Sequence, residues 1–225
     1  MQEYVIIVAG GSGNRMKSNV PKQFLPVNGL PILMHTILAF RRYSSDLKII
    51  LVLPENHFEF WNAICVQYSF SENFTLAAGG STRFDSVKNG LNSITDLEAL
   101  VAVHDGVRPI IAKGIIAASF LKASEFGSAV VSVPLKDSIR EITEAGNNAL
   151  DRNKFQLIQT PQTFRLDWMR QAFAKAYDPY FTDCASVIES EGLPIYLIPG
   201  SYENIKITTP EDLRWAEIFL SSPDE

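Results

Sequence analysis

Short, unbroken apolar runs recur along this chain, and stretches with the spacing of helices separate them. A strand with one face in water alternates apolar and polar residues. These runs do not alternate, so they predict strands that are buried on both faces. Strands of this kind that alternate with helices are typical of a mostly parallel sheet, so we expect a Rossmann-like α/β fold with helices on both faces. The expected strands are residues 4–8, 48–53, 74–80, 100–105 and 128–134.

The stretches between these runs predict helices. One of them has a proline in its first turn, where the missing N–H costs little. Near the C-terminus we expect a last helix that begins at Pro210, with Thr209 as its N-cap. The other expected helices are residues 31–42, 57–68, 86–94, 114–126, 167–177 and 183–191, and two further expected strands are residues 195–200 and 204–208.

The pattern changes after Pro134. Residues 135–158 alternate only weakly, and the letters AGNN at residues 145–148 are typical of a turn. We expect a two-stranded arm that projects from the body of one domain spanning residues 1–225. A lone hairpin is marginally stable in water, so the arm should pack on something. A second subunit and the chain's own domain are both open at this point.

The overall charge excludes several classes of protein. The formal net charge is -5, which argues against nucleic acid or an anionic membrane as a partner, so any anion must be bound locally. No apolar stretch approaches the length of a membrane span, and the N-terminus does not resemble a signal peptide. Cys65 and Cys184 are far apart and predict free thiols in a cytoplasmic protein.

A glycine-rich loop follows the first expected strand, in the stretch IIVAGGSGNRMKSNVPKQF at residues 6–24. It is not a P-loop, because Asn14 stands where that motif has its lysine after Gly13. It also lacks the third glycine of the dinucleotide fingerprint, which argues against a nicotinamide oxidoreductase. Backbone amides followed by Arg15 and Lys22 suit a polyphosphate. An ordinary strand–helix connection with two solvated cations is an equally good interpretation.

Three more stretches point to the same chemistry. In GGSTRFDSVKNGL, at residues 79–91, the glycine pair permits close approach of a flat base, and Arg83 and Ser86 serve either a ligand or the helix start. Asp105 ends a strand and suits Mg²⁺ beside phosphates, or else it is a turn aspartate. Lys206 lies in an expected apolar strand and faces either an anion or solvent. Together these residues indicate phosphoryl or nucleotidyl transfer by positioning and electrostatics.

The ordered set of motifs resembles the 2-C-methyl-D-erythritol 4-phosphate cytidylyltransferase family. The glycine loop, PKQ, DSV-x-NGL, HD-x-x-RP, TPQ-x-F, TD and NIK-x-T-x-PEDL occur in that order over almost the whole chain. The resemblance implies transfer of a cytidylyl group from CTP to a polyol phosphate in non-mevalonate isoprenoid biosynthesis, with Mg²⁺ as cofactor. Ribitol-5-phosphate cytidylyltransferase resembles this family across the same motifs and is the alternative function. A catalytically silent nucleotide-binding protein on the same scaffold is a second one.

The resemblance also implies roles for individual residues. Catalysis would depend on Arg15, Lys22 and Lys206, and Asp105 would bind Mg²⁺. In the family the arm crosses a homodimer, so arm residues would serve the neighbour's site. The nucleotide would contact Ala9, Gly10, Gly11, Gly13, Gly80, Ser81, Ser86 and Asp105. The sugar phosphate would contact Ser138, Arg152 and Thr160, and Arg83 and Arg108 are further candidates. Ser138 stands where the family usually has threonine, which keeps the hydroxyl and loses a methyl group.

Overall fold

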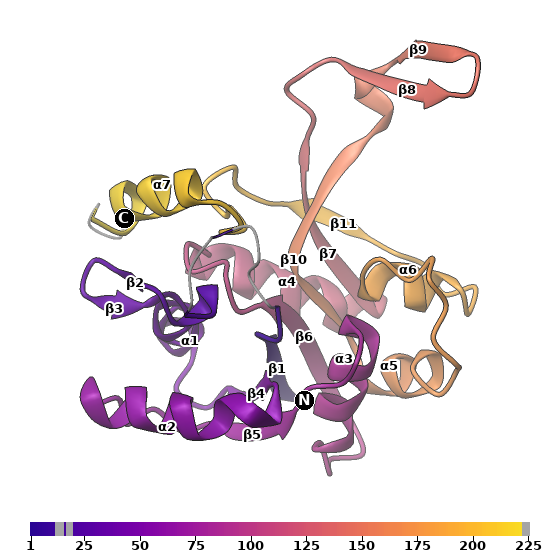
Figure 1. Ribbon diagram of the computed structural model, residues 1–225. Helices are drawn as coiled ribbons and strands as arrows, with labels where there is room; N and C mark the ends of the chain where they lie inside the picture. The colour runs from indigo at the N-terminus through magenta and orange to yellow at the C-terminus, as the bar shows by residue number, and fades with distance from the viewer. Residues whose placement is uncertain (12–15, 17–19, 222–225) are drawn as a thin grey trace.

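A seven-stranded sheet runs through the molecule (Figure 1), and the computed structural model describes residues 1–11, 16 and 20–221. The strand order is β11-β7-β10-β6-β1-β4-β5. Only β10 among these strands is antiparallel to its neighbours, so the predicted, mostly parallel α/β sheet is confirmed. The strands are β1 (Gln2–Val8), β4 (Lys48–Leu53), β5 (Thr75–Ala78), β6 (Ala99–Asp105), β7 (Ser128–Pro134), β10 (Gln156–Arg165) and β11 (Leu197–Pro199).

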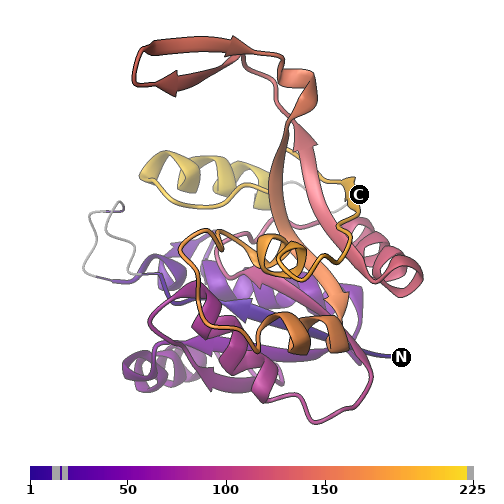
Figure 2. The same ribbon diagram turned by 90° about the vertical axis from the view of Figure 1, so that its right-hand side faces the viewer.

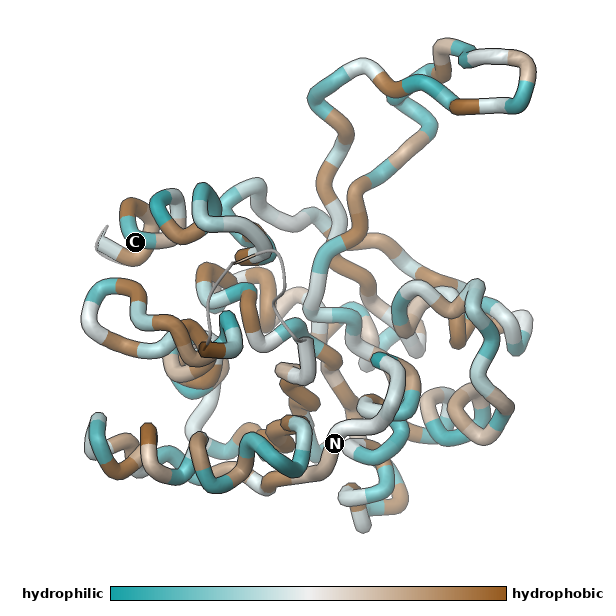
Figure 3. Tube along the Cα trace, in the orientation of Figure 1, coloured by the Kyte–Doolittle hydropathy of each residue, from teal (hydrophilic) through white to brown (hydrophobic). Residues whose placement is uncertain are grey.

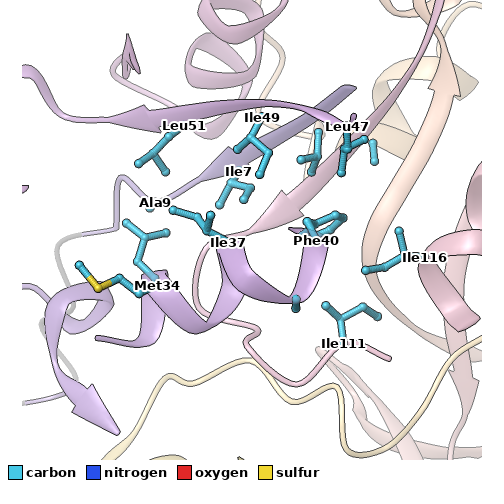
Figure 4. Packing of buried hydrophobic residues seen from close by; sticks show 14 of the residues in the cluster. Ile7, Ala9, Met34, Ile37, Phe40, Leu47, Ile49, Leu51, Ile111 and Ile116 are labelled. Carbon is cyan, nitrogen blue, oxygen red and sulfur yellow. The ribbon is translucent and has the colours of Figure 1, made fainter. Parts of the chain in front are cut away.

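Helices cover both faces of the sheet (Figures 1 and 2). The side chains of β1 explain why the strands read as unbroken apolar runs. Val5 and Ile7 pack into one core cluster, whereas Tyr4 and Ile6 pack into the other. Figure 4 shows Ile7 against Ile37 and its neighbours in the first cluster. One face is covered by α1 (Ile32–Tyr43), α2 (Phe58–Gln67) and α4 (Lys113–Phe126), and the other by α3 (Arg83–Asn92), α5 (Leu166–Ala172) and α6 (Cys184–Glu189).

A third, smaller core lies beside the carboxyl end of β6. Val107 and Ile207 pack there with Ala216 of α7 (Pro210–Ser221). This packing holds the C-terminal segment close to the loop that follows β6. The remaining short elements are η2 (Lys22–Phe24), β2 (Pro26–Val27), β3 (Leu30–Pro31), η3 (Glu55–His57) and η4 (Arg152–Lys154). No helix in the part of the chain described by the structure has the length and apolar character needed to cross a membrane.

Several expected boundaries differ from those of the structure. Residues 204–208 form no strand, because the carbonyl groups of Asn204 and Ile207 accept hydrogen bonds from side chains instead of a neighbouring strand. α3 begins before Ser86, since Thr82 and Asp85 form a capping box. α5 ends at Ala172, five residues before the expected end. The strand β10 is not among the expected strands, because its first residues, 156–158, fall within the expected arm.

The expected arm is present (Figures 1 and 2) and grows out of β7 and β10. Its strands β8 (Ile139–Thr143) and β9 (Gly146–Leu150) pair antiparallel, with Thr143 opposite Gly146. Gly146 has φ 133, a conformation that favours glycine, and the turn itself is formed by residues 144–145, at the start of the AGNN letters. Figure 3 shows hydrophobic positions along the arm. Its exposed apolar side chains are Ile142, Leu150, Phe155, Leu157 and Ile158.

Candidate active site

A cavity of about 530 Å³ opens where β1, β5 and β6 end. The carboxyl ends of parallel strands meet at one edge of a sheet, and ligands bind there in open α/β folds. Most of the residues predicted for the nucleotide line this cavity, so the structure brings them together at one edge of the sheet. The lining residues are Val8, Ala9, Gly10, Gly11, Lys22, Gln23, Gly80, Ser81, Thr82, Arg83, Ser86, Asp105, Val107, Lys206 and Thr208.

Lys22 reaches the cavity from η2 and has little exposed surface, 8%. Its Nζ donates a hydrogen bond to the main-chain oxygen of Ile207 at 3.0 Å, so the first loop and the C-terminal segment are connected across the site. Gln23 is fully buried behind it and donates from Nε2 to the oxygen of Ala9 at 2.7 Å. The predicted residues Gly13 and Arg15 lie outside the described residues.

The wall opposite this loop is the start of α3. Ser86 Oγ accepts a hydrogen bond from the N–H of Gly80 at 3.1 Å and donates to the oxygen of Thr82 at 2.9 Å. A Cβ atom on Gly80 would lie 2.2 Å from Cβ of Asp85, so a glycine is needed here for packing as well as for any ligand. Asp85 accepts from the Ser81 hydroxyl at 2.7 Å. The polar side chains of this wall are therefore held in place by their own helix start.

Asp105 is the centre of charge in the cavity. Its Oδ2 lies 3.0 Å from Lys206 Nζ and 3.3 Å from Arg108 Nε, and its Oδ1 lies 3.6 Å from a terminal nitrogen of Arg83. Burial alone would raise the pKa of Asp105, but Arg83, Lys206 and Arg108 outweigh it and hold the pKa well below the usual range. The carboxylate therefore stays ionised and gathers three cations from α3, the β6 loop and the C-terminal segment.

His104 and Thr160 support Asp105 from behind. The Asp105 N–H donates to Thr160 Oγ1 at 3.1 Å, and this hydroxyl is 3.1 Å from His104 Nδ1. Burial lowers the pKa of His104 to about 4, so the ring is neutral at pH 7. Its Nε2 therefore carries the proton that it donates to the oxygen of Arg108 at 3.0 Å, and Nδ1 accepts from the threonine. Thr160, predicted to contact the sugar phosphate, has its hydroxyl engaged in this network.

The other two predicted sugar-phosphate residues lie elsewhere. Ser138 and Arg152 are exposed on the arm, and neither lines the cavity of its own chain. Arg152 donates from a guanidinium nitrogen to the main-chain oxygen of Lys136. Figure 1 shows the arm pointing away from the body, which agrees with residues that would act outside their own subunit.

Asn204 is a residue that sequence reasoning missed. It is fully buried, donates from Nδ2 to the main-chain oxygen of Thr160 at 2.8 Å, and accepts at its own main-chain oxygen from Arg108 at 2.7 Å. It thus connects the C-terminal segment that carries Lys206 to the network behind Asp105. The signal available in the sequence was the polar side chain of Asn204, directly before an apolar residue in the letters NIK.

The donor set around Asp105 fits one kind of metal. Within residues 1–11, 16 and 20–221, no group of three or more histidine, cysteine, aspartate or glutamate side chains could hold an ion. A single carboxylate beside a phosphate-sized cavity suits Mg²⁺, which takes most of its ligands from phosphates and water. Asp105 could hold such an ion only together with a ligand that supplies further oxygens.

Comparisons with known proteins give consistent findings. A family model described as IspD, 2-C-methyl-D-erythritol 4-phosphate cytidylyltransferase, matches residues 4–222. The curated enzyme of that name from Bacteroides thetaiotaomicron is 47% identical over 220 residues, covering 98% of this chain and 100% of the relative.

Two solved structures share the fold. The 4-diphosphocytidyl-2C-methyl-D-erythritol synthase of Anaerococcus prevotii has a TM-score of 0.83 and 26% identity, over 98% of this chain and 96% of that one. The 2-C-methyl-D-erythritol 4-phosphate cytidylyltransferase of Francisella tularensis has a TM-score of 0.80 and 31% identity, over 97% of this chain and 100% of that one. Each match therefore covers the sheet, the cavity and the arm together.

Proposed function

Because this chain belongs to the 2-C-methyl-D-erythritol 4-phosphate cytidylyltransferase family, as its motifs predicted, we propose that it catalyses the reaction of that name. CTP and 2-C-methyl-D-erythritol 4-phosphate would give 4-diphosphocytidyl-2-C-methyl-D-erythritol and pyrophosphate. The observation that carries the proposal is the cavity that Lys22 lines together with Asp105 and its partners Lys206 and Arg83. A site with these cations suits direct transfer between phosphates.

In the proposed reaction an oxygen of the polyol phosphate attacks the α-phosphorus of CTP. A new P–O bond forms, the bond from the α-phosphorus to the bridging oxygen breaks, and pyrophosphate leaves with that electron pair. Negative charge grows on the bridging and leaving oxygens. Lys22, held by a hydrogen bond before substrate arrives, would stabilise this charge without reorganisation, and Lys206, which lines the same cavity, would add a second positive charge. Arg15, outside the described residues, stays a predicted third cation.

The nucleotide would occupy the edge formed by the glycine loop and the start of α3. Main-chain N–H groups at Gly10 and Gly11 suit phosphate oxygens, and Gly80 and Ser81 would face the base and ribose. Ala9 lines the same cavity, but its own N–H donates to the oxygen of Val52 at 2.9 Å. Gly13 and Ser86 were predicted for the same ligand. Asp105 would hold Mg²⁺, which when bound neutralises and orients the phosphates. These assignments are supported by the shared lining of one cavity.

We also infer a homodimer in which the arm of one copy completes the site of the other. The exposed apolar side chains of the arm support this inference, since a hairpin without a partner is marginally stable in water. Ser138 and Arg152 would then contact the sugar phosphate in the neighbouring cavity. The protein would be one nucleotidyltransferase domain over residues 1–225, with residues 135–158 as its dimerisation arm. A cytoplasmic location stays a prediction.

A pyrophosphate-release assay tests the proposal. Purified protein is given CTP, Mg²⁺ and either 2-C-methyl-D-erythritol 4-phosphate or ribitol 5-phosphate, and the initial rates are compared. We expect turnover with the first acceptor, in agreement with the names of the close relatives. Preference for ribitol 5-phosphate would replace the proposed acceptor. CTP binding without release of pyrophosphate from either mixture would instead favour the catalytically silent alternative.

A further inference from the structure

The ion pairs of Asp105 have a consequence for how a metal reaches the site. Oδ2 has Lys206 and Arg108 beside it and Oδ1 faces Arg83 at 3.6 Å, so a metal ion that approaches Asp105 is repelled by all three cations unless one of them moves away. Three cations against one carboxylate leave two positive charges in excess at this point. Asp183, the next acid near Arg83, is occupied as the N-cap of α6 and by Gln162. The nucleotide-free cavity therefore attracts a polyphosphate and repels a divalent cation.

The three cations differ in how firmly they are held. Arg108 has an 11% exposed side chain, and it also donates to the oxygen of Asn204 at 2.7 Å. Arg83 has a second contact, from a guanidinium nitrogen to Cys184 Sγ at 3.3 Å. The Lys206 side chain is 43% exposed, and among the described residues its only recorded partner is Asp105. A lysine ammonium on a flexible stem is also easier to move than a guanidinium fork with two anchors.

We propose that Lys206 is an exchangeable counter-ion of Asp105. In the nucleotide-free enzyme it occupies the position that a metal would need, so a divalent metal binds Asp105 only together with a nucleoside triphosphate. When the triphosphate enters, its oxygens offer Lys206 Nζ a new partner and supply the remaining metal ligands. Lys206 then moves from the carboxylate to the phosphates, and Asp105 becomes available. This inference rests on the proposed function, because it assigns the triphosphate and the metal to this cavity.

The exchange explains how Lys206 can lie beside Asp105 in one state of the site and beside the phosphates in another. Before the nucleotide binds, Lys206 compensates a buried carboxylate that would otherwise be costly to desolvate. After it binds, the same ammonium lies beside the phosphates, where it is needed for transfer. Arg83 and Arg108 stay with Asp105 throughout and keep the carboxylate oriented. Lys206 thus controls when a metal ion reaches Asp105, and it is also a predicted catalytic cation.

The experiment uses Mn²⁺ as a paramagnetic probe of the metal. The intact protein is titrated with Mn²⁺ with and without CTP, in the absence of any acceptor. Free Mn²⁺ is measured by electron paramagnetic resonance and protein-bound Mn²⁺ by the relaxation of water protons. For the wild-type protein we expect a protein-bound signal only in the presence of CTP. A wild-type protein that binds Mn²⁺ equally tightly without CTP would overturn the inference, and this measurement needs no variant.

A charge-neutral variant then tests Lys206 itself. Lys206→Gln should bind Mn²⁺ without nucleotide at least about tenfold more tightly than wild type, which is the scale of one removed like-charge interaction. Lys48→Gln is the matched control. Lys48 begins β4, at the end of the strands opposite the cavity, and pairs with Asp96 at 3.2 Å. This change should leave Mn²⁺ binding unaltered. Circular dichroism of each variant verifies that it is folded. An unchanged affinity in folded Lys206→Gln would contradict the exchange.

The result of the Mn²⁺ experiment can be distinguished from the result of the test of the proposed function. The same wild-type preparation is assayed for pyrophosphate release with CTP and 2-C-methyl-D-erythritol 4-phosphate. Turnover together with tight nucleotide-free Mn²⁺ binding would leave the function standing and refute the exchange. No turnover, together with CTP-dependent Mn²⁺ binding that Lys206→Gln makes independent of CTP, would refute the acceptor and support the exchange.

Discussion

Single residues in this protein act through neighbours that are distant in the sequence. Asp105 ends β6, yet the cations around it come from α3, from its own loop and from the segment before α7. Lys22 likewise depends on a main-chain oxygen 185 residues away. The contacts of Lys22, Arg83 and Arg108 fix these groups before any substrate is present. Such preorganisation is what makes a fixed cation effective in a transition state.

Lys22 gives the clearest test of that effect. Replacing it in Lys22→Ala should lower kcat by at least about 10²-fold, the scale seen when one preorganised donor is lost. The affinity for CTP should fall less, because other groups also contact the nucleotide. Pyrophosphate release measures kcat and calorimetry measures CTP binding. Lys48→Ala, an exposed lysine at the opposite sheet edge, is the control and should keep normal turnover. A Lys22→Ala enzyme with near-normal kcat would remove Lys22 from the mechanism.

His104 predicts a pH dependence of stability. The pKa of His104 is about 4 in the folded protein, whereas its ordinary value is 6.5. The unfolded chain therefore takes up a proton more readily than the folded one. Its contribution to the free energy of unfolding is therefore complete above pH 6.5 and is lost as the pH falls to about 4. The loss should be roughly 3 kcal/mol, from the difference in pKa. Denaturant unfolding in metal-free buffer between these pH values measures it.

Other acids also titrate in this range, so the wild-type slope alone is not sufficient. His104→Gln removes the imidazole and keeps a polar side chain of similar reach. Although this variant should be less stable at pH 7, its free energy of unfolding should change less between pH 6.5 and 4 than that of the wild type. Parallel slopes for the two proteins would show that His104 is not the titrating group.

At the scale of elements, α3 positions one wall of the site by packing closely on the sheet. A Cβ atom on Gly90 would lie 2.8 Å from Cγ2 of Ile6 in β1 and 3.1 Å from Cγ2 of Val52 in β4. Both strand side chains are fully buried and have no room to yield. The glycine therefore lets the helix that carries Arg83 and Ser86 approach the strands whose ends form the cavity.

Gly90→Ala should thus destabilise the protein, although alanine is the better helix former. Overpacking costs about 1–3 kcal/mol, and the gain in helix propensity offsets about 1 kcal/mol of it. Gly114→Ala is the control, since a Cβ atom there meets nothing within 4 Å in α4. That change should be neutral or stabilising. Chemical denaturation compares the two, and equal stability of both variants would refute the packing argument.

At the scale of the whole molecule, the arm is the part that cannot be understood from one chain. It contributes nothing to the three core clusters described above, and its apolar side chains are exposed. Exposed apolar side chains on a projecting hairpin are a feature of association surfaces. The body, in contrast, has its own core on both faces of the sheet and should fold without the arm.

Shortening the arm tests the inferred dimer. Replacing residues 139–150 with a short glycine–serine turn should give a monomer by light scattering, while circular dichroism and cooperative unfolding stay those of a folded α/β protein. Turnover should fall sharply, because Ser138 and Arg152 are no longer held at the neighbouring site. Ala149→Ser, a small change on the exposed arm, is the control and should remain dimeric. A shortened variant that still dimerises would place the interface elsewhere.

The sequence by itself determined the class of fold and the edge at which the site lies. Strands buried on both faces require unbroken apolar runs, and this requirement acts locally, so β1, β4, β6 and β7 were recognisable without a structure. The glycine loop, GGSTR and HDGVRP follow such runs, and the geometry of parallel strands then brings them together. The projecting arm was also recognisable, from the loss of apolar periodicity after Pro134.

Only the tertiary structure decided how the charges of the site are arranged. Segments that are far apart in the chain meet in three places. β10 inserts between β7 and β6, residues 204–208 form no strand, and Asp105 contacts Arg83 and Lys206. Propensity and periodicity describe neighbours along the sequence, whereas an ion pair depends on which segments the core packs side by side. The residues of the candidate site were therefore visible in the sequence, but their partners were not.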